Sequence, residues 1–101
     1  MNQPLTKTFI RNLIETNDRA LSRAVVVIYE RQTLEEQISE LTQEHNGKGF
    51  TSFDAEILSS FAKQIQAGRT LSPKQISLAR KKMIKYSSQL LIVAQAKAQI
   101  N

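Results

Sequence analysis

Residues 10–41 of this chain read IRNLIETNDRALSRAVVVIYERQTLEEQISEL. Positions spaced alternately by three and four residues form one continuous and mostly apolar seam through this stretch. Its members are Ile10, Leu13, Asn17, Ala20, Ala24, Val27, Arg31, Leu34, Ile38 and Leu41. A heptad pattern of this length is typical of a helix that packs along another helix. We therefore predict an all-α fold, with the seam as a coiled-coil-like dimer interface.

Two polar residues interrupt the seam, Asn17 and Arg31. An Asn at such a position often fixes the register of a helix pair at some loss of stability. The residues predicted to contribute to dimerisation are Leu13, Asn17, Ala24, Val27, Arg31, Leu34, Ile38 and Leu41. The alternative is that the seam packs within one chain as part of its own core.

The simplest interpretation of this region is one long helix from about residue 5 to about residue 44. Two alternative breaks stay open, at 16–18 and at 32–33, because both places offer an N-cap residue. Thr33 and Glu36 also form the T-x-x-E pattern of a capping box. The segment HNGKGFTS, residues 45–52, is then the clearest loop in the chain, since it contains two glycines.

A second helix is predicted over 53–67. Asp54 and Glu56 lie in its first turn, where carboxylates suit the helix dipole, and Gly68 is a natural residue to follow its end. Its apolar stripe consists of Ile57, Phe61 and Ile65, with Leu58 beside them.

A third helix is predicted over 72–98. Ser72 is its N-cap, Pro73 occupies the first helical position, and Gln75 completes a capping box. One stripe of this helix is apolar, and lysines lie on the opposite side. The stripe contains Ile76, Ala79, Met83, Tyr86, Leu90 and Ala94. The chain, residues 1–101, is therefore predicted to be a single helical domain, arranged as a helical hairpin or small bundle.

Positive charge is concentrated in the C-terminal half. The net charge is +5, yet residues 1–52 hold six basic and seven acidic residues. Residues 57–101 hold eight Lys or Arg and no Asp or Glu. Such a field attracts polyanions, and nucleic acid is the commonest polyanion in a cell. The residues predicted to contact DNA or RNA are Lys48, Arg69, Lys74, Arg80, Lys81, Lys82 and Lys85.

Few aromatic residues are available for stacking on bases, which favours backbone contacts or a helix in a groove. Changing Lys81, Lys82 and Lys85 to Glu is predicted to abolish binding while the protein stays folded. Two alternatives stay open. The basic face can be a solvated surface, or it can pair with the acidic stretch 35–44, within one chain or across a dimer.

No residue pattern indicates an enzyme. His45 is the only histidine, and no orienting partner is spaced to serve it. Glu36, Glu40 and Glu44 share one helix face, but no second type of metal ligand accompanies them. The loop NGKGF, residues 46–50, lacks the full spacing of a phosphate-binding loop, although Lys48 can touch a phosphate. We predict no catalytic residue, no cofactor and no metal.

Cysteine is absent, and no signal peptide or membrane-spanning stretch is evident. These features predict a cytoplasmic protein that does not enter the membrane.

Four strings stand out together: YERQT at 29–33, NGKGF at 46–50, FDAEILSSFAKQI at 53–65 and LSPKQISLARKKMIKYSSQL at 71–90. In this combination, the chain resembles a family of small uncharacterised proteins carried by bacteriophages and conjugative plasmids. The resemblance covers about residues 20–95 and implies a mobile-element setting. Proteins of that setting regulate, accompany DNA transactions or block host defences. The leading hypothesis is a non-enzymatic protein of such an element that binds nucleic acid or a nucleoprotein complex through its basic C-terminal half. The alternative is a protein-interaction module, an inhibitor or adaptor of a host machine such as an anti-defence protein.

Overall fold

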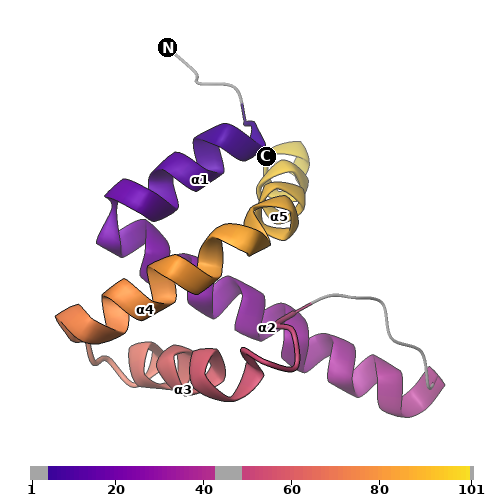
Figure 1. The fold of residues 1–101 in the computed structure, drawn as a ribbon. Helices are drawn as coiled ribbons and strands as arrows, with labels where there is room; N and C mark the ends of the chain where they lie inside the picture. The colour runs from indigo at the N-terminus through magenta and orange to yellow at the C-terminus, as the bar shows by residue number, and fades with distance from the viewer. Residues whose placement is uncertain (1–4, 43–48, 101) are drawn as a thin grey trace.

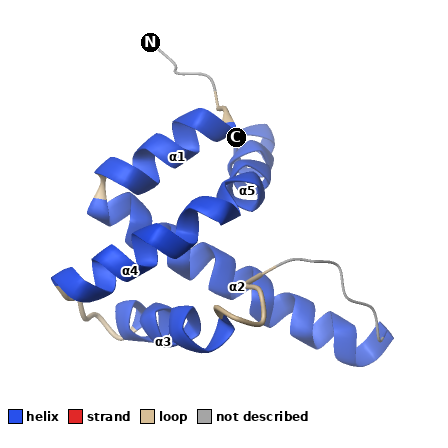
Figure 2. Ribbon diagram, in the orientation of Figure 1, coloured by secondary structure: helices blue, strands red, loops and turns tan. Residues whose placement is uncertain are grey.

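The structure is a computed structural model that describes residues 5–42 and 49–100, and the side chains among these except at 33–42 and 98–100. Every regular element in this part of the chain is helical (Figure 2). The elements are α1 (Lys7–Thr16), α2 (Asp18–Thr42), α3 (Ala55–Gln66), α4 (Pro73–Met83), the 3₁₀ turn η1 (Ile84–Tyr86) and α5 (Ser87–Ile100). The all-α prediction is confirmed.

The N-terminal helical region is divided at Asn17. This residue is extended, and its amide donates to the Leu13 carbonyl at 2.9 Å, which closes α1. Its side-chain Oδ1 accepts from the Ala20 amide at 3.0 Å, which caps α2. The interpretation of 5–44 as one helix is therefore wrong, and the alternative break at 16–18 is correct. No break occurs at 32–33, because α2 continues through it.

A single hydrophobic core surrounds α2, which packs against α1, α3, α4 and α5 (Figure 1). Leu21, Val25 and Ile28 of α2 are fully buried at its centre. Each buried side chain of this size contributes about 1.5–3 kcal/mol relative to an exposed one. The other core residues are Ile10, Ile14, Ala24, Phe50, Leu58, Phe61, Ala62, Leu71, Ala79, Met83, Tyr86 and Leu90.

The start of α4 is as the sequence predicts. The Ser72 Oγ accepts from the Gln75 amide at 3.2 Å, and the Gln75 side chain accepts from the Ser72 amide at 2.9 Å. The predicted continuous helix over 72–98 is wrong, however, because η1 separates α4 from α5. The Ser87 hydroxyl donates to the Ile84 carbonyl at 2.6 Å across this turn. Tyr86 is thereby held where its ring and hydroxyl face the 49–54 segment.

The predicted second helix begins two residues late, at Ala55, and ends as expected. Gly68 has a φ of +88°, and the amide of Arg69 donates to the Gln64 carbonyl at 3.1 Å. The Gly68 amide donates to the Ile65 carbonyl at 2.9 Å, and these two hydrogen bonds together form a Schellman motif.

The C-terminal end of α2 extends past α3 and away from the other helices (Figure 1). The described part of the chain contains no helix that is long and apolar enough to cross a membrane. Several predicted residues fall outside the described side chains or residues: Leu34, Glu35, Glu36, Ile38, Glu40, Leu41, Glu44, His45, Gly47 and Lys48.

Candidate nucleic-acid interface

The segment 49–54 is fixed onto α2 and α5 by side-chain amides. The Gln89 side chain accepts from the Gly49 amide and donates to the Gly49 carbonyl, both at 2.9 Å. The Phe50 amide donates to the Gln32 Oε1 at 3.1 Å. Gly49 has a φ of +91°, and a Cβ there would lie 2.5 Å from the Gln32 Cβ. Only glycine allows so close an approach without displacement of α2.

Tyr86 joins this segment to η1. Its ring packs edge-on against Phe50, with centroids 5.6 Å apart and an interplanar angle of 78°. Its hydroxyl accepts from the Thr51 amide at 3.0 Å and donates to the Asp54 Oδ2 at 2.6 Å. Both aromatic rings are buried, so neither is available for stacking on a base.

Asp54 is a buried carboxylate at the N-terminus of α3, only 1% exposed. Lys82 Nζ lies 3.1 Å from its Oδ1, and Lys85 Nζ lies 2.6 Å from its Oδ2. Burial opposes ionisation of this group. The hydrogen bonds from Lys85, Tyr86 and Lys82 outweigh that effect and lower the pKa of Asp54 from 3.8 to about 2. Asp54 is therefore an anion at neutral pH that holds α3 to α4 and η1.

The contacts with Asp54 also shift the pKa values of Lys85 and Tyr86. The hydrogen bond from Lys85 to Asp54 raises the pKa of Lys85, so this amine stays charged. Burial, together with the hydrogen bond to Asp54, raises the pKa of the Tyr86 hydroxyl. Asp54 and Lys85 therefore keep opposite charges over the neutral pH range, and the Tyr86 hydroxyl stays protonated.

Arg80 is engaged with the N-terminal helices. Its Nε donates to the Ile14 carbonyl at 2.9 Å, and its guanidinium pairs with the Asp18 carboxylate. Arg80 thus ties α4 to the α1–α2 junction. Sequence reasoning assigned it a phosphate contact, and no periodicity in the chain indicates a partner 62 residues away.

The predicted nucleic-acid-binding residues therefore fall into separate groups. Lys74, Lys81 and Arg69 are exposed and pair with no carboxylate among the described residues. Arg80, Lys82 and Lys85 are in ion pairs, although half of the Lys85 side chain stays exposed. Lys48 lies outside the described residues. Changing Lys81, Lys82 and Lys85 to Glu would thus also remove both cations that neutralise buried Asp54, so that variant cannot separate binding from folding.

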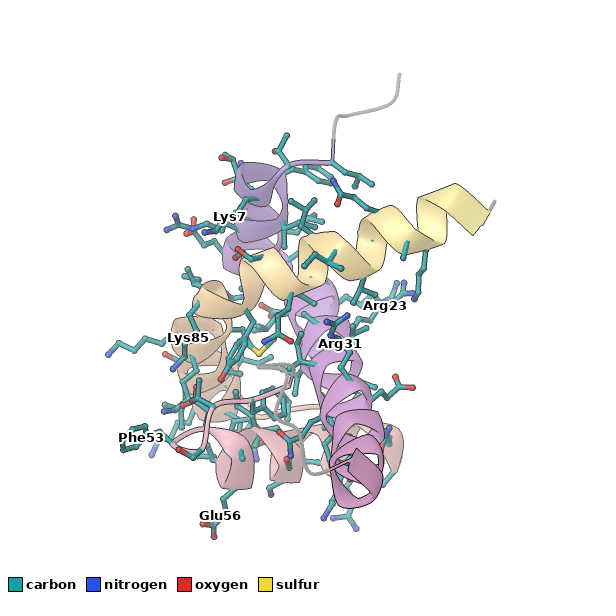
Figure 3. All side chains as sticks on the ribbon, turned by 90° about the vertical axis from the view of Figure 1, so that its right-hand side faces the viewer. Lys7, Arg23, Arg31, Phe53, Glu56 and Lys85 are labelled. Atoms are coloured by element: carbon teal, nitrogen blue, oxygen red, sulfur yellow. The ribbon has the colours of Figure 1, made fainter. Side chains whose placement is uncertain are left out.

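Phe53 is not among the predicted nucleic-acid contacts. Its side chain is 92% exposed, immediately beside buried Asp54. Figure 3 shows Phe53 and Lys85 on the same side of the molecule. The turn at 51–54 leaves Phe50 buried and Phe53 exposed. No motif in the sequence predicts this turn.

The described residues contain no group of three His, Cys, Asp or Glu side chains that could hold a metal ion. Comparisons with protein families, with curated proteins and with solved structures found no match to this chain. The resemblance to mobile-element proteins therefore stays a prediction from the sequence.

Proposed function

We propose that this protein binds nucleic acid, alone or in a nucleoprotein complex, through the outer face of α4 and η1. The proposal places it in the cytoplasm of a bacterial host, as a non-enzymatic protein of a phage or plasmid that works as a homodimer. The observation that carries the proposal is a row of exposed lysines, Lys74, Lys81 and Lys85, on one side of this helical segment.

The spacing of this row suits a phosphate backbone. At about 100° and 1.5 Å per residue, positions 74 and 81 of α4 lie within about 20° of one another around the helix axis and about 11 Å apart along it. Lys85 follows in the tighter turn η1. Each ammonium is a compact point charge that can contact a phosphate without reading a base, so the expected binding is backbone-directed.

The surroundings of the row favour an anionic ligand. No acidic residue occurs after Glu56, and the nearest carboxylate, Asp54, is buried behind Lys82 and Lys85. Phe53 offers a fully exposed ring on the same side (Figure 3). One aromatic ring beside several cations can stack on a single unpaired base, and such a contact adds about 1–3 kcal/mol.

The test is a charge-removal variant that leaves the internal ion pairs intact. Lys74→Gln with Lys81→Gln removes two of the three exposed charges and touches neither Asp54 nor Asp18. Fluorescence anisotropy with labelled DNA and RNA, single- and double-stranded, measures the affinity across a salt series. We expect the slope of log K against log salt to become shallower by about 1.8 on double-stranded DNA.

The matched control is Lys7→Gln with Arg11→Gln. It removes the same charge from exposed positions of α1 that line neither the α4 face nor the groove formed by α1, α2 and α5. The proposal requires the control to keep the wild-type slope at unchanged molecular mass. Equal slopes for the Lys74/Lys81 variant and wild type would refute the assignment of this face.

A second function, a protein-interaction module such as an inhibitor or adaptor, is favoured by a separate observation. An open apolar groove lies between α1, α2 and α5. Weak binding to every nucleic acid, together with co-purification of one defined host protein, would support this function in place of the first.

A further inference from the structure

The groove between α1, α2 and α5 has a volume of about 370 Å³. It is lined mainly by apolar side chains of these three helices, all of which also contribute to the core. The apolar α2 residues that line it are small or β-branched. Those used below are Ala20, Ala24 and Val27 of α2, with Leu90 and Val93 of α5.

Three exposed cations border this groove, Arg19, Arg23 and Lys97. None of them pairs with a carboxylate in the part of the chain that the structure describes. Figure 3 shows Arg23 and Arg31 on the opposite side from Lys85 and Phe53. The groove is therefore distinct from the proposed nucleic-acid face, and its chemistry suits an apolar helix that carries carboxylates.

The chain itself contains such a helix. Residues 33–42 read TLEEQISELT, with Leu34, Ile38 and Leu41 continuing the heptad seam and three glutamates between them. The helical backbone of this segment is the end of α2 that extends away from the other helices (Figure 1). Most of the stability of an amphipathic helix in water comes from the packing of its apolar face.

We propose that the groove binds the C-terminal end of α2 from a second copy of this chain, in an antiparallel pairing with two-fold symmetry. The register follows from the seam. With Arg31 at the axis, Ala24 lies opposite the second copy's Ile38, and Val27 and Ala20 lie within one residue of level with its Leu34 and Leu41. Each small groove residue thus meets a larger side chain, which is the complementarity that close helix packing requires.

The residue at the centre of this pairing is Arg31, whose side chain is half-buried. Its neighbour Glu30 is exposed and in no ion pair with the described residues. A two-fold axis at Arg31 brings the second copy's Glu30 close to this side chain, and the two groups carry opposite charge.

The first test is the mass of the full chain by light scattering over a concentration series. We expect a dimer, and we expect Leu34→Asp with Ile38→Asp to weaken it by roughly a hundredfold or more, because both apolar contacts occur twice. The control, Ser60→Asp with Gln66→Asp, adds the same charge at exposed positions of α3 and should leave the mass unchanged.

The second test fixes the direction of the helices, using the absence of native cysteine. A mixture of Val27→Cys and Leu34→Cys chains should form a mixed disulfide under mild oxidation, since the pairing places these positions nearly level with each other. Val27→Cys alone should stay uncrosslinked, because its two copies are then separated by about 11 Å along the axis. Ser60→Cys, at an exposed position of α3, is the control that measures how much disulfide forms by random collision.

A monomer at all concentrations would overturn the proposal and leave the groove to a foreign acidic helix. A dimer that withstands the Asp substitutions, or that crosslinks through Val27→Cys alone, would overturn it as well. The inference rests on the homodimer of the proposed function, which a monomer would also contradict. None of these results depends on nucleic-acid binding, so the assignment of the α4 face is tested separately.

Discussion

Replacing Asp54 with Asn tests how α3 is held to α4 and η1. The substitution keeps the shape of the side chain and removes its charge. Lys82 and Lys85 then lose the anion that they share, and Tyr86 keeps only a neutral acceptor. We expect the variant to fold and to be less stable than wild type at pH 7.

The magnitude follows from the pKa of Asp54, which is about 2 in the folded protein and 3.8 without these contacts. A difference of that size corresponds to about 2 kcal/mol of stability at neutral pH. The folded-state pKa is the lower one, so this contribution is complete above about pH 5 and is lost as the pH falls toward 2. At pH 3 about half of it should remain.

The assay is urea unfolding followed by helical circular dichroism, for wild type and Asp54→Asn at pH 7 and pH 3. The comparison between the two proteins cancels the titration of the other carboxylates. Asp18→Asn is the control, since Asp18 is also in an ion pair but its side chain is 70% exposed. Exposed pairs contribute about 0–1 kcal/mol. Equal stability of Asp54→Asn and wild type at pH 7, or a gap that widens in acid, would refute the reasoning.

Two further substitutions, each paired with a control substitution, test the local geometry by the same unfolding assay. Gly49→Ala should destabilise by about 2 kcal/mol or more, because its Cβ would lie 2.7 Å from the Gln32 Cα at a φ of +91°. Gly68→Ala, with no atom within 4 Å of the new Cβ, should lose only about 1 kcal/mol, and equal losses would contradict this difference. Ser72→Ala should destabilise by about 1 kcal/mol through loss of the capping box, whereas exposed Ser88→Ala should change stability by less than about 0.5 kcal/mol.

The signals that the sequence carries reliably are those in which a few adjacent residues satisfy one another. Ser72, Pro73 and Gln75 complete the start of α4 among themselves, and Gly68 supplies the left-handed residue that ends α3. These features depend on local backbone geometry alone, so the sequence predicts them without knowledge of the fold.

Asn17 shows where such reasoning fails. An Asn on a heptad seam and an Asn that caps a helix have the same local sequence. Which role it takes depends on whether α1 turns back to bury Ile10 and Ile14 against the other helices, and that is a property of the whole core. The break at η1 likewise has no glycine or proline to mark it.

The candidate interface was predicted only in part, for a related reason. The composition locates the excess positive charge in the C-terminal half, but it does not show which of these cations form ion pairs within the protein. Asp54 lies 28 residues before Lys82 in the sequence. Its position in the first turn of the predicted second helix is already explained by the favourable interaction of a carboxylate with the helix dipole, so no further partner is expected. Only the packing of α3 against α4 shows that its carboxylate faces two lysines.

The most direct measurement of the proposed function is the salt dependence of wild-type binding to double-stranded DNA. Phosphate contacts by Lys74, Lys81 and Lys85 give an expected slope of log K against log salt of about −2.7 for each copy that is bound. The expected slope on a single strand is about −2.1. A slope near zero, or binding that disappears at physiological salt, would contradict the assignment of this basic face as the working surface.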